Sequence, residues 1–253
     1  MSRVKAKKHL GQHFLKDRNV AEKITRTLTG DGYSDVIEVG PGTGALTRFL
    51  VGRGFRKLVA AEIDSESVRY LEQWKDERIT IVEEDFLKMD LDNLFEDKFA
   101  VTGNFPYNIS SQIFFKILEN RHKVVEVTGM VQKEVALRIV SQPGTRVYGI
   151  LSVLLGAFYD ARLLFTVPPH LFVPPPAVNS AVIRLRRNST TSLPCNEELF
   201  FRVVKSAFNQ RRKMLRNALG AQFDTGGLPE SLMSMRAEQL HVSDFVAITS
   251  QLE

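Results

Sequence analysis

A four-residue segment of this chain, Asn104-Phe105-Pro106-Tyr107, has residue types suited to chemistry on an exocyclic amine, and it follows an apolar run. The amine of adenine is a poor nucleophile because its lone pair is delocalised into the ring, so a catalyst must hold its N–H groups with acceptors. Asn104 Oδ1 and the Pro106 carbonyl are such acceptors, and Tyr107 would stack on the base, which contributes roughly 1–3 kcal/mol. The same residues also suit a turn after a strand, so the segment alone leaves both interpretations open.

A glycine-rich segment upstream predicts a cofactor site. Residues 34–39 have the pattern of a buried strand, residues 40–44 read Gly-Pro-Gly-Thr-Gly, and residues 45–50 have helical spacing. Glycines let the backbone turn tightly and approach a ligand without a Cβ in the way. The spacing matches neither a dinucleotide-binding fingerprint nor a P-loop, which disfavours a pyrophosphate ligand.

Acidic residues follow the next two predicted strands. Glu62 lies 22 positions after Gly40 (62 − 40), where an acid that binds ribose hydroxyls is expected. Asp85 follows the strand predicted at residues 79–82 and is placed to accept from an adenine amine. Each acid alone also fits a solvated strand end. The ordered set fits S-adenosylmethionine, whose sulfonium and ammonium charges would suit Glu38 as well.

Taken together, these segments resemble the ribosomal RNA adenine N6-dimethyltransferases. Further matches cover nearly the whole chain, at residues 9–15, 132–135, 148–152, 172–180 and 207–213. The last two segments resemble the small-subunit (KsgA-type) branch of the family more than the Erm resistance enzymes.

The resemblance implies S-adenosylmethionine as the cofactor, and it assigns site residues. The implied cofactor pocket consists of His13, Leu15, Gly40, Gly42, Glu62, Ile63, Asp85, Phe86 and Asn104. The implied catalytic set is Asn104, Pro106, Tyr107 and Phe172, with Tyr107 and Phe172 on the two faces of the target base. Phe172 precedes three prolines and also suits a rigid structural turn.

Two positions depart from the usual pattern of the family. His13 stands where Asn is usual, and Phe105 stands where Leu is usual. Phe105 is expected to alter only packing, because the turn needs its backbone. His13 can still donate to the cofactor carboxylate, but the charge of an imidazole varies near neutral pH, which leaves its role open.

Composition limits the class of protein. The chain has 253 residues with 43% hydrophobic content, enough for one large domain or for one domain with a small appendage. Cys195 is the only cysteine, which excludes an internal disulfide and a cysteine-cluster zinc site, and no metal is expected. No apolar run reaches the roughly 20 residues of a membrane helix. We expect a cytoplasmic monomer that does not enter a membrane.

Positive charge gathers in two places. Residues 1–30 hold eight Lys or Arg against two acids, in a chain whose net charge is +5. The arm residues Lys5, Lys7 and Lys8 would neutralise RNA phosphates, although a solubilising tail fits as well. Arg211, Arg212, Lys213 and Arg216 form the second group, and the spacing of the last three predicts one shared helical face. Such a face suits structured RNA, and it also suits an ordinary solvated helix.

Alternating strands and helices predict an α/β fold with a mostly parallel, doubly wound sheet. Further strands are expected at residues 99–103, 124–131, 163–167 and 181–185, and a helix at residues 111–118. The last two strands predict an antiparallel hairpin at one edge, as in the class I, Rossmann-like S-adenosylmethionine-dependent methyltransferases to which the family belongs. Residues 1–188 are expected to form this domain, residues 189–195 a linker, and residues 196–253 a small all-helical domain.

The function that the resemblance implies is dimethylation of the N6 amines of two adjacent adenosines in the 3′-terminal hairpin loop of 16S rRNA, within a small-subunit precursor. An Erm-like methyltransferase acting on 23S rRNA is the nearest alternative. A second alternative is an assembly factor that holds the immature subunit and whose methylation is incidental. DNA or protein methylation is less favoured, because related tetrapeptides there commonly carry Pro at the position of Phe105.

Overall fold

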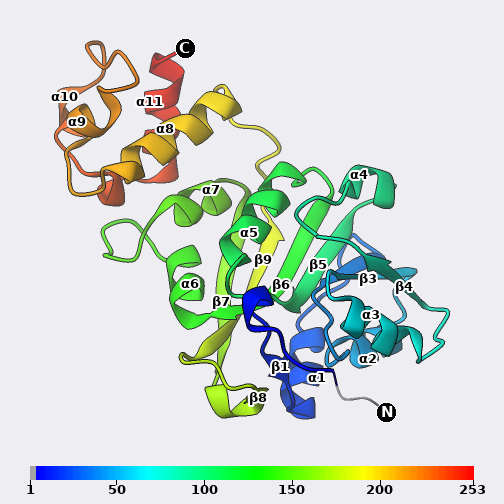
Figure 1. Cartoon of the computed structure of the whole chain (residues 1–253). Coiled ribbons are helices and arrows are strands. Elements are labelled where there is room, and N and C mark those ends of the chain that lie inside the picture. The colour runs from blue at the N-terminus through cyan, green and yellow to red at the C-terminus, as the bar shows by residue number, and fades with distance from the viewer. Residues whose placement is uncertain (1–3) are drawn as a thin grey trace. The chain divides into compact units, whose positions relative to one another are not determined.

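Seven strands form the main sheet, in the order β4-β3-β2-β5-β6-β9-β7 (Figure 1). Strands β2 to β6 pair with one another in parallel, whereas β9 runs antiparallel to β6. The strands are β2 (Asp35–Val39), β3 (Lys57–Glu62), β4 (Ile79–Glu83), β5 (Phe99–Asn104), β6 (Val124–Gln132), β7 (Tyr159–Val167) and β9 (Ser180–Arg187). The predicted α/β class, with a mostly parallel sheet, is confirmed.

The computed structural model describes residues 4–253. Two compact units make up the chain. The first contains the chain up to Ala136 together with Arg162–Arg187, and the second contains Leu137–Ala161 and Asn188–Glu253. Residues 137–161 thus group with the C-terminal helices, so the second unit is larger than the domain expected at residues 196–253.

The centre of the sheet is buried and largely apolar. All five residues of β2 are buried, and β2 lies between β3 and β5. Near-continuous apolar strands are typical of parallel sheets flanked by helices. The helices of the first unit are α1 (Arg18–Arg26), α2 (Thr47–Leu50), α3 (Ser65–Glu72), α4 (Leu91–Leu94) and α5 (Ser110–Glu119), and α6 (Lys133–Ile139) continues into the second unit.

Carboxylates fix the starts of two helices that flank the site. Asp17 precedes α1 and accepts a hydrogen bond from the Val20 amide at 2.8 Å. Asp64 precedes α3 and accepts from the Glu66 amide at 3.2 Å. Each carboxylate satisfies an amide that has no partner inside the first turn of its helix, so the chain direction after β1 and after β3 is set locally.

A second, two-stranded sheet joins the amino-terminal arm to a later part of the chain. Strand β1 (Phe14–Leu15) pairs antiparallel with β8 (Phe172–Val173), with Leu15 opposite Phe172. The side chains of Leu15 and Phe172 are both buried in the hydrophobic core. Two-residue strands are too short to show a periodicity, and the sequence analysis did not predict this pairing.

The second unit is built from helices around a small aromatic cluster. The ring of Phe208 contacts two other rings. Its centroid lies 6.1 Å from that of Tyr148 and 6.0 Å from that of Phe245. Helix α7 packs against α8 and α11. The helices of this unit are α7 (Ile150–Phe158), α8 (Glu197–Asn209), α9 (Leu215–Leu219), α10 (Glu230–Met233) and α11 (Val242–Gln251).

The basic residues of this unit do not share one helical face, and that prediction was wrong. Helix α8 ends at Asn209 because Gln210 leaves the helical conformation, with φ −116° and ψ 48°, and α9 begins only at Leu215. Arg212 and Lys213 therefore lie in the intervening turn, where both are exposed.

Within residues 4–253, no helix combines the length and the apolar character that crossing a bilayer requires.

Candidate functional site

Four adjacent strands of the sheet bring the predicted site residues to one edge. Gly40 follows β2, Glu62 ends β3, Asp85 follows β4 and Asn104 ends β5. Because these strands are parallel and neighbouring, their carboxyl ends meet at the same edge of the sheet, where ligands bind in open α/β folds. The spacing that the sequence analysis used thus corresponds to one continuous row of strand ends.

Glu62 is a buried carboxylate held by the backbone. Its Oε2 accepts from the Gly42 amide at 2.9 Å, and its Oε1 accepts from the Ile63 and Asp64 amides at 3.0 Å each. Burial raises the pKa of Glu62, and these backbone hydrogen bonds oppose the rise. The three amides fix the carboxylate rigidly at the start of the segment that leads to α3.

The glycine loop fits a ligand that lies close to the backbone. Gly40 and Gly42 have φ values of 67° and 55°, in the left-handed region that favours glycine. A Cβ on Gly42 would come within 2.8 Å of the Phe14 ring, and the nearest heavy atom to a Cβ on Gly40 would be Pro106 Cδ at 3.6 Å. This cradle, together with an acid at the end of the next strand, fits the ribose and the amino-acid portion of S-adenosylmethionine.

Glu38, which the sequence analysis suggested for the cofactor charges, is buried in β2. The residue is 1% exposed, and its Oε2 accepts a hydrogen bond from Thr47 Oγ1 at 2.6 Å. Burial raises the pKa of Glu38 to about 7.

Asn104 and Pro106 present the two acceptors that an amine requires. Asn104 Nδ2 donates to the His13 carbonyl at 2.8 Å, and Oδ1 has no hydrogen-bond partner among residues 4–253. The Pro106 carbonyl accepts from the Ile109 amide at 3.2 Å. A carbonyl oxygen has a second lone pair, so it can accept a further hydrogen bond from a substrate.

Tyr107 is fastened at its hydroxyl and covered on one face. Its hydroxyl hydrogen-bonds Ser180 Oγ. Its ring stacks with the His13 imidazole, with centroids 5.2 Å apart and planes 29° apart. Burial raises the pKa of Tyr107, so the phenol remains protonated at neutral pH.

Phe172 does not reach this pocket, so the sandwich expected of it with Tyr107 is not formed. The ring is 1% exposed and belongs to the hydrophobic core, where β8 places it opposite Leu15. In this structure the ring that stacks with Tyr107 is His13.

The amino-terminal arm lies across the strand ends and is held by side chains. Lys7 Nζ forms an ion pair with Asp64, and Gln12 Nε2 donates to the other oxygen of Asp64 at 3.3 Å. Asn108 Nδ2 donates to the His9 carbonyl at 3.4 Å. Burial alone would raise the pKa of Asp64, but hydrogen bonds from Lys7 and Gln12 outweigh this effect and lower the pKa. Lys7, which the sequence analysis expected to contact RNA phosphates, thus has an ion-pair partner within the protein.

Three adjoining cavities surround this arm. The first, of about 50 Å³, is lined by Gly40, Glu62 and Asn104, and it is far below the roughly 300–1,000 Å³ of ligand sites. The second, of about 440 Å³, contains Tyr107 and His13 in its wall. Residues 10–14 of the arm line this first cavity, and residues 11–13 also line the second.

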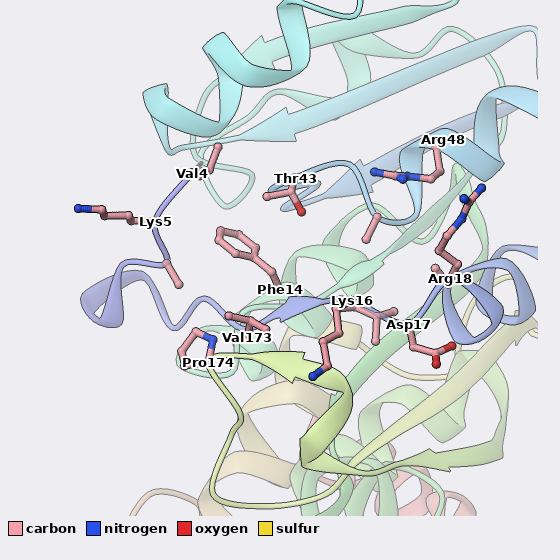
Figure 2. Close-up of a pocket in the computed structure, with 14 residues that line it drawn as sticks. Val4, Lys5, Phe14, Lys16, Asp17, Arg18, Thr43, Arg48, Val173 and Pro174 are labelled. Atoms are coloured by element: carbon pink, nitrogen blue, oxygen red, sulfur yellow. The ribbon is translucent and has the colours of Figure 1, made fainter. Parts of the chain in front are cut away.

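The third cavity, of about 620 Å³, lies on the other side of Phe14, whose ring also lines the first cavity. Figure 2 shows Phe14 between Thr43 of the glycine loop and Val173 of β8. Lys16, Arg18, Lys5 and Arg48 also line this cavity, so its apolar interior has basic side chains around it.

The remaining predicted residues occupy varied surroundings. Asp85 Oδ1 accepts from the Leu87 amide at 3.0 Å, and Phe86 is buried beside it at 4% exposure. Ile63 is 51% exposed next to Glu62. Lys5 and Lys8 are exposed on the arm.

The two outer arginines of the second unit have partners. Arg211 pairs with Glu238, and Arg216 pairs with Glu230. Arg212 and Lys213 have no ion pair among residues 4–253.

The sequence analysis missed three residues that shape the site: Gln12, Asp64 and Ser180. Asp64 follows Glu62 by two positions and precedes a helix, which is a detectable cap signal, but its ion pair with Lys7 spans 57 positions of sequence. Nothing in the local pattern predicts that contact.

Known proteins are similar to this chain over nearly its whole length. The family model described as ribosomal RNA adenine dimethylase matches residues 3–253. A ribosomal RNA small subunit methyltransferase A from Cytophaga hutchinsonii is 51% identical and aligns over 100% of this chain and 99% of its own. The protein of the same name from Bacteroides thetaiotaomicron is 52% identical over 100% and 96%. The crystal structure of a dimethyladenosine transferase from Plasmodium falciparum matches with a TM-score of 0.77 and 23% identity, covering 93% of this chain and 96% of that one.

Proposed function

Because the chain belongs to the ribosomal RNA adenine dimethylase family, we propose that it uses S-adenosylmethionine to dimethylate the N6 amines of two adjacent adenosines in the 3′-terminal hairpin loop of 16S rRNA. The observation that carries the proposal is the pair of acceptors at the end of β5, Asn104 Oδ1 and the Pro106 carbonyl, beside the glycine loop. Relatives near 50% identity over their full length bear the name of small-subunit methyltransferases. This favours the small subunit over the large-subunit RNA of Erm-like enzymes.

The cofactor would lie along the carboxyl ends of β2 to β5. In this placement Asp85 and Phe86 would hold the adenine, with Ile63 beside it, and Glu62 would bind the ribose hydroxyls. Gly40, Gly42, His13 and the main chain of Leu15 would hold the amino-acid end. The basic side chains around the larger cavity, among them Lys16 and Arg18, supply a potential that suits the carboxylate of that end.

When bound, the cofactor supplies an electrophilic methyl group. The protein's own contribution is alignment: Asn104 Oδ1 and the Pro106 carbonyl accept the two N–H groups of the target amine and direct its lone pair out of the ring system. The same oxygens stabilise the positive charge that develops on nitrogen, because they are fixed dipoles in a site shielded from water. Tyr107, anchored through Ser180, offers a face to the base. No general base is needed, because the methylated nitrogen is strongly acidic until it loses its proton.

The target base has to leave any stacked arrangement to reach these acceptors, as in other enzymes that modify bases. RNA phosphates would be contacted by the exposed cations Lys5, Lys8, Arg212 and Lys213. The affinity that these contacts contribute would fall as the salt concentration rises. We propose that the protein acts as a monomer, in the cytoplasm, on a partly assembled small subunit.

The test is transfer of labelled methyl groups from S-adenosylmethionine to undermethylated small subunits and, separately, to large-subunit RNA, followed by nucleoside analysis. The proposal predicts N6,N6-dimethyladenosine in the small subunits alone. Label confined to large-subunit RNA would favour the Erm-like alternative. Tight binding to small subunits with no label in either RNA would favour the assembly-factor alternative.

A further inference from the structure

The third cavity, of about 620 Å³, is large enough to hold a ligand of its own, because ligand sites in proteins measure roughly 300–1,000 Å³. Figure 2 shows the Phe14 ring and Val173 in its lining. Val173 is 41% exposed, so the fold leaves an apolar side chain of this lining in contact with water. An aromatic ring offers a surface to any base, since every base has a π face. The lining therefore suits a planar, largely apolar group such as a nucleobase.

Positive charge surrounds this apolar lining. The cavity is lined by four cationic side chains and one acidic side chain, namely Lys5, Lys16, Arg18, Arg48 and Asp17. The Asp17 carboxylate is already engaged at the start of α1. Lys16 and Arg18 are exposed, and within residues 4–253 neither side chain has an ion pair or a hydrogen bond. Both flank the amino terminus of α1, where the helix dipole disfavours positive charge, so they do not stabilise that helix and remain available for an anion.

The third cavity adjoins the second, which contains Tyr107 in its wall. Ala6 and Pro174 line both cavities, so single residues separate them. In a strand whose target base lies against Tyr107, the neighbouring nucleotide is one phosphodiester away. A target base gives up its stacking when it enters a pocket, which leaves the neighbouring base without a partner on that side. An RNA strand can therefore continue from the second cavity into the third.

From this arrangement we propose that the third cavity binds the nucleotide next to the target adenosine in the same RNA strand. The base of this nucleotide lies against Phe14 and Val173, and its phosphates are contacted by Lys16 and Arg18. The inference rests on the proposed function and deepens it, because it adds a second nucleotide site beside the one for the base that is methylated. It also assigns an RNA contact to Lys16 and Arg18, beyond their potential toward the cofactor carboxylate.

The phosphate contacts are tested with the double variant Lys16→Gln/Arg18→Gln. The measurement is the Kd for undermethylated small subunits at salt concentrations from about 50 to about 200 mM, together with the Kd of S-adenosylmethionine from calorimetry. Arg69→Gln/Lys98→Gln is the matched control, because both of these residues are exposed and line none of the three cavities. The two double variants change the net charge of the protein equally.

Each phosphate contact with a single strand adds about 0.7 to the slope of log affinity against log salt concentration. The slope of Lys16→Gln/Arg18→Gln should be shallower than that of the wild type by about 1.4, so its disadvantage should shrink about sevenfold over that range of salt. The control should keep the wild-type slope, and the Kd of the cofactor should stay within about fivefold. The inference is overturned by an unchanged slope, or by a cofactor Kd that rises more than the small-subunit Kd at the lowest salt concentration.

The base is followed by base-specific chemical probing of the small-subunit RNA in the complex. With the wild type, one base directly next to the target adenosine should be protected. Val173→Trp fills the cavity and should leave that base reactive, whereas Val173→Ala keeps the cavity open and should protect the base as the wild type does. Equal reactivity in all three complexes, whether high or low, would contradict the inference. Absence of dimethyladenosine with the wild type would instead count against the proposed function, whatever these variants show.

Discussion

The strand ends and the arm that covers them hold their polar groups in different ways. Glu62 is 4% exposed and accepts three backbone amides. The arm before β1, by contrast, is held by contacts of single side chains, such as the Lys7 to Asp64 ion pair, in which the lysine side chain is 36% exposed and the carboxylate is buried. The first arrangement fixes geometry, and the second opens more easily. The difference suits methyl transfer, because the reaction needs fixed acceptors and the cofactor needs access to its site.

The largest binding effect is expected at Glu62. Glu62→Gln leaves an amide NH₂ group facing backbone donors in place of an acceptor, and a buried unsatisfied group costs about 1–3 kcal/mol. It also removes the acceptor for ribose hydroxyls. We expect the Kd of S-adenosylmethionine to rise by more than about tenfold and the thermal midpoint to fall, measured by calorimetry and thermal unfolding. Unchanged affinity would show that the ribose lies elsewhere.

The free energy of unfolding is expected to depend on pH through Glu38, which is buried in β2. Its pKa is raised from 4.5 to about 7 by burial. The folded protein therefore retains a proton that the unfolded chain releases between these pH values, so stability from this group is present below pH 4.5 and is lost as pH rises to about 7. The loss amounts to about 3 kcal/mol.

Glu38→Gln should remove this dependence while it keeps an acceptor for Thr47. The free energy of unfolding of the variant relative to the wild type should thus increase from pH 4.5 to pH 8, measured by urea denaturation. Parallel pH profiles of the two proteins would contradict the raised pKa. Glu62 has a pKa raised in the same direction, and the comparison with the variant separates the two groups.

The packing behind the Asn104 segment can be tested with one methyl group. A Cβ on Gly129 would lie 2.3 Å from Phe105 Cε2, inside the fully buried core. Overpacking of this kind costs typically 1–3 kcal/mol, so Gly129→Ala should lower the free energy of unfolding by about that amount. Gly52→Ala is the control, because nothing lies within 4 Å of its Cβ position. Equal stability of the two variants would show that the Phe105 ring repacks around the added methyl group without a cost in free energy.

The smallest effect is expected on the arm. Lys7→Gln removes an ion pair in which the lysine side chain is 36% exposed and the Asp64 carboxylate is buried. Gln can still donate a hydrogen bond to Asp64, so the loss of global stability should be small, about 1 kcal/mol. Amide exchange of residues 7–13 should nevertheless accelerate in the free protein, and the difference from the wild type should shrink at high salt. Slow, unchanged exchange would show that the other contacts suffice to close the arm.

Local pattern allowed the sequence to predict the strand ends. The buried runs that end at Val39, Glu62 and Asn104 each place a residue of suitable chemistry after an apolar stretch, and parallel pairing then brings the three together. The family resemblance added the cofactor and the target. For the row of strand ends, periodicity and motif spacing were enough.

Contacts between distant segments were not predictable in this way. Phe172 looked free to stack on a base, but its pairing with Leu15 turns it into the core. The shared face of Arg212, Lys213 and Arg216 depended on a helix that ends at Asn209. In each case the deciding contact or chain break lies outside the pattern from which the prediction was made.

The most direct test of the account is the single-turnover rate of methyl transfer by Asn104→Ala, with S-adenosylmethionine and undermethylated small subunits both saturating, beside Lys7→Gln. Removal of one fixed dipole from a polar catalytic site typically costs 10²–10³-fold. The account predicts a loss of about that size for Asn104→Ala and a rate within about twofold of the wild type for Lys7→Gln. An Asn104→Ala rate within about threefold of the wild type would contradict the claim that the fixed acceptors at the strand end carry the chemistry.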